Sequence, residues 1–146
     1  MRTTDGEKYV GRFKVEVELA NNDDVTDARR GLLEPDKVRR LKILGVVDSG
    51  AARLVLPQDA VKKLGLVSTA KVKVRYANNS IAKRPLVEGV YLELLGRHSV
   101  FNAIVEPKRD TALIGAIVLE DLDFVVDCTK GRLVPRDPDY VVSEAE

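Results

Sequence analysis

Apolar and polar residues alternate along residues 11–20 (GRFKVEVELA), where every second side chain is apolar. This period of two predicts a half-buried β-strand. Residues 21–37 are polar, contain a glycine and a proline, and predict a long loop. Residues 38–48 become progressively more apolar toward Asp48, as expected of a strand that enters the core.

The next segments predict a short strand over residues 52–56 and a helix over residues 57–65. In the helical segment, PQDAVKKLG, Pro57 stands near the start, Asp59 lies in the first turn and Gly65 comes at the end. This order of proline, acid and terminal glycine is typical of a short helix.

The second half of the chain predicts mainly hairpins. The segments KVKVRYA and SIAKRPLV flank Asn78-Asn79, a turn-forming pair, and indicate a first hairpin. Pro85, inside the second of these segments, marks an edge strand or a bulge. Residues 89–107 predict a second hairpin with its turn at Gly96-Arg97.

Residues 111–127 predict a strand, a tight glycine turn, a short helix and another strand, and residues 131–135 predict a last strand. Many short strands with two brief helices make the expected fold class mostly β. The 146 residues suffice for one domain over residues 1–146, with a core at about 11–135. The acidic tail, residues 136–146, is expected to fray unless Tyr140-Val141-Val142 pairs with another segment.

Composition adds few constraints. The chain is 45% hydrophobic and 32% charged, which is ordinary for a soluble globular protein. Its 24 Lys and Arg residues against 23 Asp and Glu give a net charge of +1, so neither a nucleic acid nor a membrane is expected as partner. The sequence contains no run long enough for a membrane span and no signal-peptide core.

Cysteine and histidine indicate neither a metal site nor a cofactor. The single cysteine, Cys128, has no neighbouring thiol or histidine to share a metal. It cannot form an internal disulfide, which fits a reducing compartment, so we expect a cytoplasmic protein. His98, the single histidine, stands beside a predicted hairpin turn and is expected at the surface.

The carboxylate of Asp48 occupies an unusual place in GVVDSGAARLVLP, between an apolar run and a tight turn. One interpretation is an Asx turn, in which the side chain bonds its own backbone. The order of apolar strand, glycine turn and helix recurs around Gly115 in ALIGAIVLEDLDFVVD, although this copy lacks the acid. The repetition indicates two similar half-units packed together.

The segments VVDSGA (Val46 to Ala51) and, after two hairpins, ALIGAIVLEDL (Ala112 to Leu122) together resemble the retropepsin-like aspartic proteases. The likeness covers most of the chain, from Leu41 to Val134. It implies a closed, β-barrel-like acid-protease fold with one or two short helices. It also implies a single-domain protease that is active as a two-fold dimer.

The resemblance assigns roles to the motif residues. An aspartic protease hydrolyses peptide bonds with two carboxylates that share a proton. Because this chain has one Asp-Ser-Gly triplet, Asp48 of each subunit would meet across a two-fold axis in a homodimer. Ser49 would bond to the partner's loop, Gly50 would direct its N–H at the carboxylate, and Ala51 would complete the loop. Gly115 would pack beneath it.

The first hairpin would be the substrate-binding flap, closing over a peptide or protein substrate. Its tip comprises Tyr76, Ala77, Asn78, Asn79, Ser80 and Ile81. This tip has no glycine, which implies a stiffer flap than is usual in the family. The chain also carries Ala52-Arg53 where the family often has an acidic or polar residue, and its segment 21–37 is longer than the corresponding turn in the short viral enzymes.

Two alternatives stay open beside the protease. The first is a catalytically silent retropepsin-like dimer that serves as an interaction module, because fold alone does not establish function. The second is a swapped-hairpin DNA-binding regulator or antitoxin, which VVDSGAARLVLPQDAVKKLGL also resembles. The second alternative leaves the later half of the chain unexplained.

Overall fold

The computed structural model describes residues 12–145. Gly11, the first residue of the first predicted strand, and Glu146, the last residue of the tail, lie outside the described residues. The strands are β1 (Arg12–Asn21), β2 (Arg40–Asp48), β3 (Leu54–Pro57), β4 (Ser68–Arg75), β5 (Ile81–Leu94), β6 (Arg97–Glu106), β7 (Ala112–Ile114), β8 (Phe124–Asp127) and β9 (Arg132–Pro135). The helices are α1 (Asn22–Arg29), the 3-10 helix η1 (Pro35–Lys37), α2 (Gln58–Leu64) and α3 (Ala116–Leu122).

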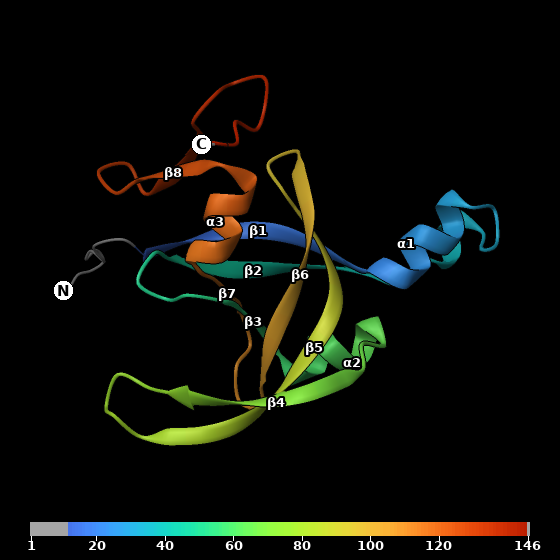
Figure 1. The fold of residues 1–146 in the computed structure, drawn as a ribbon, viewed down its shortest axis with the longest axis horizontal. Helices are drawn as coiled ribbons and strands as arrows, with labels where there is room; N and C mark the ends of the chain where they lie inside the picture. Colours follow the sequence, from blue (N-terminus) through green and yellow to red (C-terminus); the bar gives the residue numbers. More distant parts are fainter. Residues whose placement is uncertain (1–11, 146) are drawn as a thin grey trace.

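Six strands close into a barrel in the order β1-β2-β7-β3-β6-β5, and β5 pairs back onto β1. The barrel closes because β5 is long enough to serve two neighbours along the same edge. Its first half pairs with β4, whereas its second half pairs with β1 through the register that sets Leu19 opposite Leu92. The hairpin of β4 and β5 therefore continues beyond the barrel, below it in Figure 1. A mostly β, closed-barrel fold confirms the predicted class.

The alternating pattern of the sequence supplies the core of the barrel. In β1, Val17 and Leu19 are almost fully buried while the intervening charged residues stay more exposed. Burial of apolar surface at these alternate positions stabilises the barrel by about 25 cal/mol per Å² removed from water. The other fully buried large side chains come from β2, β3, α2, β5, β7 and α3: Val47, Leu54, Leu56, Leu64, Val87, Leu92, Leu94, Ile114 and Leu122.

Both predicted hairpins form, but their inner strands are one continuous strand, β5. Gly89, with φ +73, and a shift in the pairing with β6 between Val87 and Val90 mark the junction between the two halves. The second turn was predicted one residue too late, because Leu95 and Gly96 both have positive φ and β6 already begins at Arg97. Positive φ at both central residues is what a tight hairpin turn requires.

The prediction of a loop over residues 21–37 was wrong, because α1 and η1 occupy this segment. The Asn21 side chain caps α1 by accepting a hydrogen bond of 3.1 Å from the Asp24 N–H. Asp24 is buried and receives three hydrogen bonds from Arg39, which hold the pKa of its carboxyl below the usual range. Polar capping and ion pairing thus replace the apolar periodicity that would reveal a helix in the sequence.

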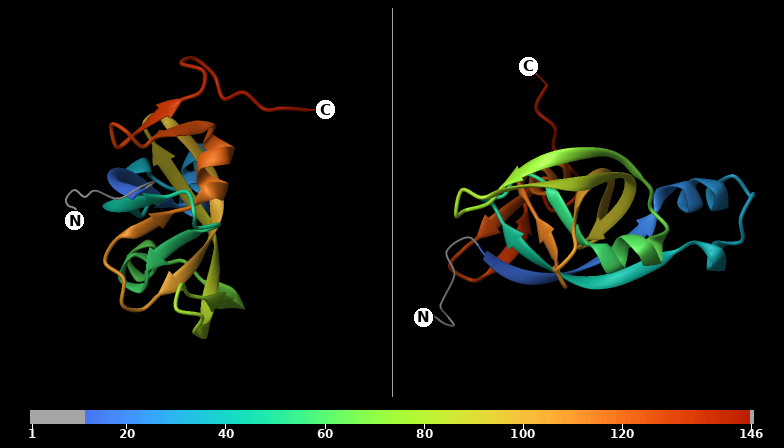
Figure 2. Two further views of the ribbon diagram at one scale, coloured as in Figure 1. Left: turned by 90° about the vertical axis from the view of Figure 1, so that its left-hand side faces the viewer. Right: turned by 90° about the horizontal axis from the view of Figure 1, so that it is seen from below.

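The described residues contain three short α-helices rather than the two that the sequence predicted. The unpredicted helix, α1, extends from one end of the barrel in the right-hand view of Figure 2. In the part of the chain that the structure describes, no helix is both long enough and apolar enough to span a membrane.

The two related half-units of the sequence lie side by side. Strands β2 and β7 are parallel neighbours, with Val46 opposite Leu113 and Val47 opposite Ile114. Each strand leads into a turn, after Asp48 in one case and at Gly115 in the other. The apparent sequence repeat therefore corresponds to two adjacent strands that deliver both motifs to the same end of the barrel.

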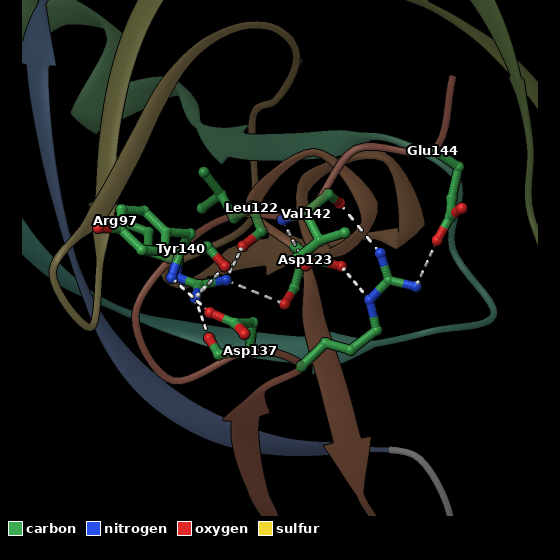
Figure 3. A network of polar contacts seen from close by, with 8 residues as sticks. Arg97, Leu122, Asp123, Asp137, Tyr140, Val142 and Glu144 are labelled. Atoms are coloured by element: carbon green, nitrogen blue, oxygen red, sulfur yellow. Dashed lines mark hydrogen bonds and ion pairs between the residues drawn. The ribbon is translucent and has the colours of Figure 1, made fainter. Parts of the chain in front are cut away.

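The C-terminal segment, which was expected to fray, is anchored to the end of α3 by two arginines (Figure 3). Arg97 donates to the backbone carbonyls of Leu122, Asp123, Asp137 and Tyr140. Arg136 pairs with the buried Asp123 at 2.9 Å, and Asp123 also accepts a hydrogen bond from the N–H of Val142. Residues 136–142 are thus held by polar contacts rather than by pairing into the β8–β9 sheet.

Candidate active site

A groove with a volume of about 760 Å³ lies between the loop that follows β2 and the β4–β5 hairpin. Asp48 and Gly50 line one side of it, and Tyr76 and Ala77 line the opposite side. In Figure 1 the loop and the tip of the hairpin extend toward the same side of the molecule. The groove is large enough to receive an extended segment of polypeptide.

Asp48 is the last residue of β2, and its side chain is 25% exposed. One carboxylate oxygen, Oδ1, accepts a hydrogen bond of 3.0 Å from the N–H of Gly50. The other, Oδ2, pairs with Nε of Arg12 at 3.4 Å. The antiparallel register of β1 and β2 places Arg12 directly opposite Asp48 and so brings this cation to the carboxylate.

The loop after Asp48 is clamped to the start of α3. The N–H of Ala116 donates to the carbonyl of Ala51 at 2.8 Å, and the N–H of Ile117 donates to the carbonyl of Ala52 at 3.0 Å. Gly115 makes this approach possible, because a Cβ at that position would lie 2.5 Å from the Arg53 carbonyl oxygen. The second glycine motif thereby supports the loop that carries the acid.

The structure brings four of the predicted motif residues together: Asp48, Gly50, Ala51 and Gly115. Gly50 directs its N–H at the carboxylate, as the resemblance implied. Ser49 is exposed, and within residues 12–145 its hydroxyl has no hydrogen-bond partner. Its predicted bond to a partner subunit stays a prediction.

Two of the six predicted flap residues line the groove, and the other four face solvent. Tyr76 turns back toward the barrel, where its hydroxyl donates to Glu106 and accepts a hydrogen bond of 3.0 Å from Arg84. Burial and the bond to Glu106 raise the pKa of the Tyr76 hydroxyl. Ala77 also lines the groove. The remaining predicted flap residues, Asn78, Asn79, Ser80 and Ile81, are exposed at the tip and do not line it.

Sequence analysis missed several charged residues of the groove, including Arg12, Glu106 and Arg109. Arg109 donates hydrogen bonds to the carbonyl of Thr111 at 2.7 Å and to its hydroxyl at 3.1 Å. Burial, together with the positive charge of Arg12, lowers the pKa of the Arg109 guanidinium. These residues stand far from Asp48 in the chain, and no short motif marks them.

Residues 12–145 contain no cluster of three or more His, Cys, Asp or Glu side chains placed to hold a metal ion. The groove provides one aspartate and one glutamate, each already paired with an arginine. The groove thus presents a carboxylate, Asp48, oriented by the backbone N–H of Gly50.

No protein-family model matches the sequence, and no curated protein matches it significantly. Among solved structures, the chain is similar to EIAV protease in complex with the inhibitor HBY-793, at 20% identity and a TM-score of 0.50. This likeness covers 82% of the present chain and 93% of the other. A retropepsin-like aspartic protease from Rickettsia conorii is 16% identical, with a TM-score of 0.45 and coverages of 80% and 86%.

The likeness to EIAV protease covers most of the present chain, and it shows the fold of the chain. The protein thus has the fold of the retropepsin-like aspartic proteases, as its sequence motifs predicted. A sequence identity of 20% establishes the fold but not the function, because one fold can host different functions.

Proposed function

We propose that the protein is an aspartic endopeptidase, in which Asp48 from each subunit of a homodimer activates the attacking water. The observation that carries this proposal is the position of Asp48. It is a partly exposed carboxylate in a groove of peptide size, on a loop clamped against Gly115. The retropepsin fold of the chain supports the same chemistry.

The proposed reaction requires two carboxylates that share one proton, because two like charges in such close proximity cannot both be ionised. The ionised carboxylate takes a proton from water as the water oxygen bonds to the peptide carbonyl carbon. The protonated carboxylate donates a hydrogen bond to the carbonyl oxygen. The C–N bond then breaks as the leaving amine receives a proton from the pair. The N–H of Gly50 orients Oδ1 of Asp48 throughout.

A homodimer follows from the single Asp-Ser-Gly triplet, since one chain supplies one half of the site. In the proposed dimer the two Asp48 loops face each other, and two copies of the groove join into one channel. Sedimentation should accordingly show a dimer at micromolar concentrations, whereas a protein that stays monomeric there would contradict the scheme.

One observation favours the silent interaction module as a second candidate. Arg12 occupies Oδ2 of Asp48 in the single chain, so it competes for an oxygen that the proposed dyad uses. In the module, the groove would bind a peptide without cleaving it. The DNA-binding alternative gains no such support, because the second half of the chain, which it left unexplained, completes the barrel.

The decisive experiment compares the wild type with Asp48→Asn on a peptide library. We expect hydrolysis to fall by about 10²-fold or more, because the variant loses the acid–base group. The fold and dimer should persist, since an Asn oxygen can still accept from the N–H of Gly50. For the wild type, the rate should be bell-shaped in pH and centred below neutrality, as for a shared-proton pair.

Three other outcomes would each reject part of the proposal. Unchanged hydrolysis in Asp48→Asn would remove Asp48 from the mechanism. A variant that fails to fold, monitored by circular dichroism, would indicate a structural aspartate. A wild type that binds peptides but cleaves none, over the whole pH range, would favour the silent module.

A further inference from the structure

The groove is far more basic than the protein as a whole. The complete chain is nearly balanced, with 24 Lys and Arg against 23 Asp and Glu. Among residues 12–145, two acids line the groove, Asp48 and Glu106. The basic residues that line it are Arg12, Arg53, Lys73, Arg75, Lys108 and Arg109. The excess of positive charge is therefore a local property of this surface and not a consequence of composition.

The two acids of the groove leave most of this positive charge uncompensated. Glu106 pairs at 2.9 Å with Arg84, which does not line the groove, and also accepts the hydroxyl of Tyr76. Asp48 pairs with Arg12. Within residues 12–145, the other five basic residues of the groove form no ion pair with a carboxylate.

Arg109 shows most directly that this charge is oriented before any ligand binds. Its guanidinium is partly buried and is fixed by the carbonyls of Thr111 and Ala112 and by the Thr111 hydroxyl. A cation held by neutral acceptors keeps its full charge available to an incoming anion. An arginine already fixed in this way loses little side-chain entropy when it binds a carboxylate.

Apolar side chains lie among these cations. Val55, Val74, Ile104 and Leu113 line the same groove. The surface therefore offers apolar contacts to some side chains of a bound segment and positive charge to others. An extended peptide, whose side chains alternate between two faces, can satisfy both kinds of contact.

We propose that the groove selects acidic polypeptide segments, with apolar residues at the centre and Glu or Asp on either side. This inference rests on the proposed function, because it names the substrate class of the same site. In the proposed dimer, the two-fold axis places a second set of cations on the opposite side of the centre. Acidic residues are accordingly favoured both before and after the scissile bond.

The test uses two series of fluorescent decapeptides with the same central apolar pair, flanked by Glu in one series and by Gln in the other. Binding is measured with the Asp48→Asn protein, which cannot consume the peptide, and kcat/KM is measured with the wild type. We expect the Glu series to be favoured on the order of 5-fold to 10-fold at low salt. The preference should shrink when about 0.5 M salt screens the charges.

Paired variants locate the effect in the groove. Arg53 and Arg75 are exposed and line it, whereas Arg29 and Arg40 are exposed at the α1 end of the molecule, outside its lining. The double variant R53Q/R75Q should lose most of the preference for Glu. R29Q/R40Q changes the net charge by the same amount and should keep it.

Equal affinity of the Asp48→Asn protein for both series would overturn the inference, as would equal loss of preference in the two double variants. If the Gln series is cleaved as well as the Glu series, and cleavage depends on Asp48, the inference fails while the proposed protease stands. If the Glu series binds preferentially in a salt-sensitive manner but no peptide is cleaved, the acidic selectivity stands and the proposed protease fails.

Discussion

At the scale of single residues, the site depends on how closely two backbone segments approach. Gly115 has an extended backbone (φ −89, ψ −176) that any residue can adopt, so glycine is not required there for conformation. It is required for space, because the carbonyl oxygens of Arg53 and Ala51 lie 2.5 and 2.9 Å from the position a Cβ would occupy. The loop that carries Asp48 would have to move to accept any larger residue.

We therefore expect Gly115→Ala to reduce both stability and hydrolysis. The added methyl group meets backbone atoms that have no rotamer to change, so the free energy of unfolding should fall by about 1–3 kcal/mol. Displacing the loop also moves the Asp48 carboxylate. Hydrolysis should therefore fall by more than the increase in unfolded protein accounts for. Urea unfolding and kcat/KM on the same preparation measure the two effects.

Gly31→Ala is the matched control for this change. Gly31 has φ +76 and open space around its Cβ position, so alanine there costs about 1–2 kcal/mol through backbone strain alone. Gly31 follows α1, outside the groove, and its variant should keep wild-type hydrolysis. Equal losses of activity in the two variants would show that Gly115 acts through global stability only.

The residues of the site differ in how far sequence can predict them. Asp48, Gly50 and Gly115 lie in short motifs whose spacing marks a turn, and the structure brings them together. Arg12 and Arg109 reach the same site only through strand register and barrel closure. No local pattern encodes those long-range pairings, so sequence analysis had no signal for the basic groove.

At the scale of elements, the β4–β5 hairpin has a compact tip that is anchored to the barrel through Tyr76. Tyr76, directly after β4, bonds through its hydroxyl to Glu106 at the end of β6 and to Arg84 of β5. At the tip, Oδ1 of Asn78 accepts hydrogen bonds from both the N–H and the hydroxyl of Ser80, and Asn79 has φ 69. These side-chain hydrogen bonds, which glycines could not form, stiffen the turn.

Replacing both tip asparagines with glycine should make the hairpin more mobile. The change removes the Asn78 hydrogen bonds and increases the number of backbone conformations that the turn can adopt. Both KM and kcat should therefore change. The pH profile should stay in place, because it belongs to the Asp48 pair. A shift of the pH optimum by a full unit, or wild-type kinetics on every peptide, would contradict the assignment of this hairpin as the flap.

The single variants Asn78→Gly and Asn79→Gly separate the two contributions. Asn79→Gly keeps both hydrogen bonds and relieves a positive φ, so its kinetics should stay near those of the wild type. Asn78→Gly should account for most of the double variant's effect. If Asn79→Gly instead changes KM and kcat more than Asn78→Gly does, the stiffness of the turn comes from the backbone of Asn79.

Elements whose stability comes from burial were the predictable ones. Strand β1 alternates apolar and charged residues, and its apolar positions fill the core. Helix α1 is held by the Asn21 cap and the Asp24–Arg39 pair, and it buries no apolar side chain. Because its stability comes from specific polar contacts, hydrophobic periodicity could not reveal it.

At the scale of the whole molecule, the C-terminal region carries the features expected of a subunit interface. The β8–β9 sheet has two strands within residues 12–145, so each strand leaves one edge unpaired there. Exposed apolar side chains occur in the same region, with Val125 at 49% and Tyr140 at 75% exposure. Contacts between two such surfaces would bury apolar area and pair strand edges, which supports the proposed dimer.

Mixing subunits tests whether one site is shared between two chains. Wild-type protein is held at a fixed concentration above the dimer dissociation constant, and an equal amount of Asp48→Asn protein is exchanged into it. If each site needs Asp48 from both subunits, random pairing should lower the hydrolysis rate to about half, because mixed dimers carry one carboxylate only. Rates unchanged by mixing, with exchange verified by labelled subunits, would show that each chain acts alone and would reject the two-fold dyad. A variant such as Lys62→Gln, exposed on α2 and outside the groove, serves as the mixing control and should leave the rate per wild-type subunit unreduced.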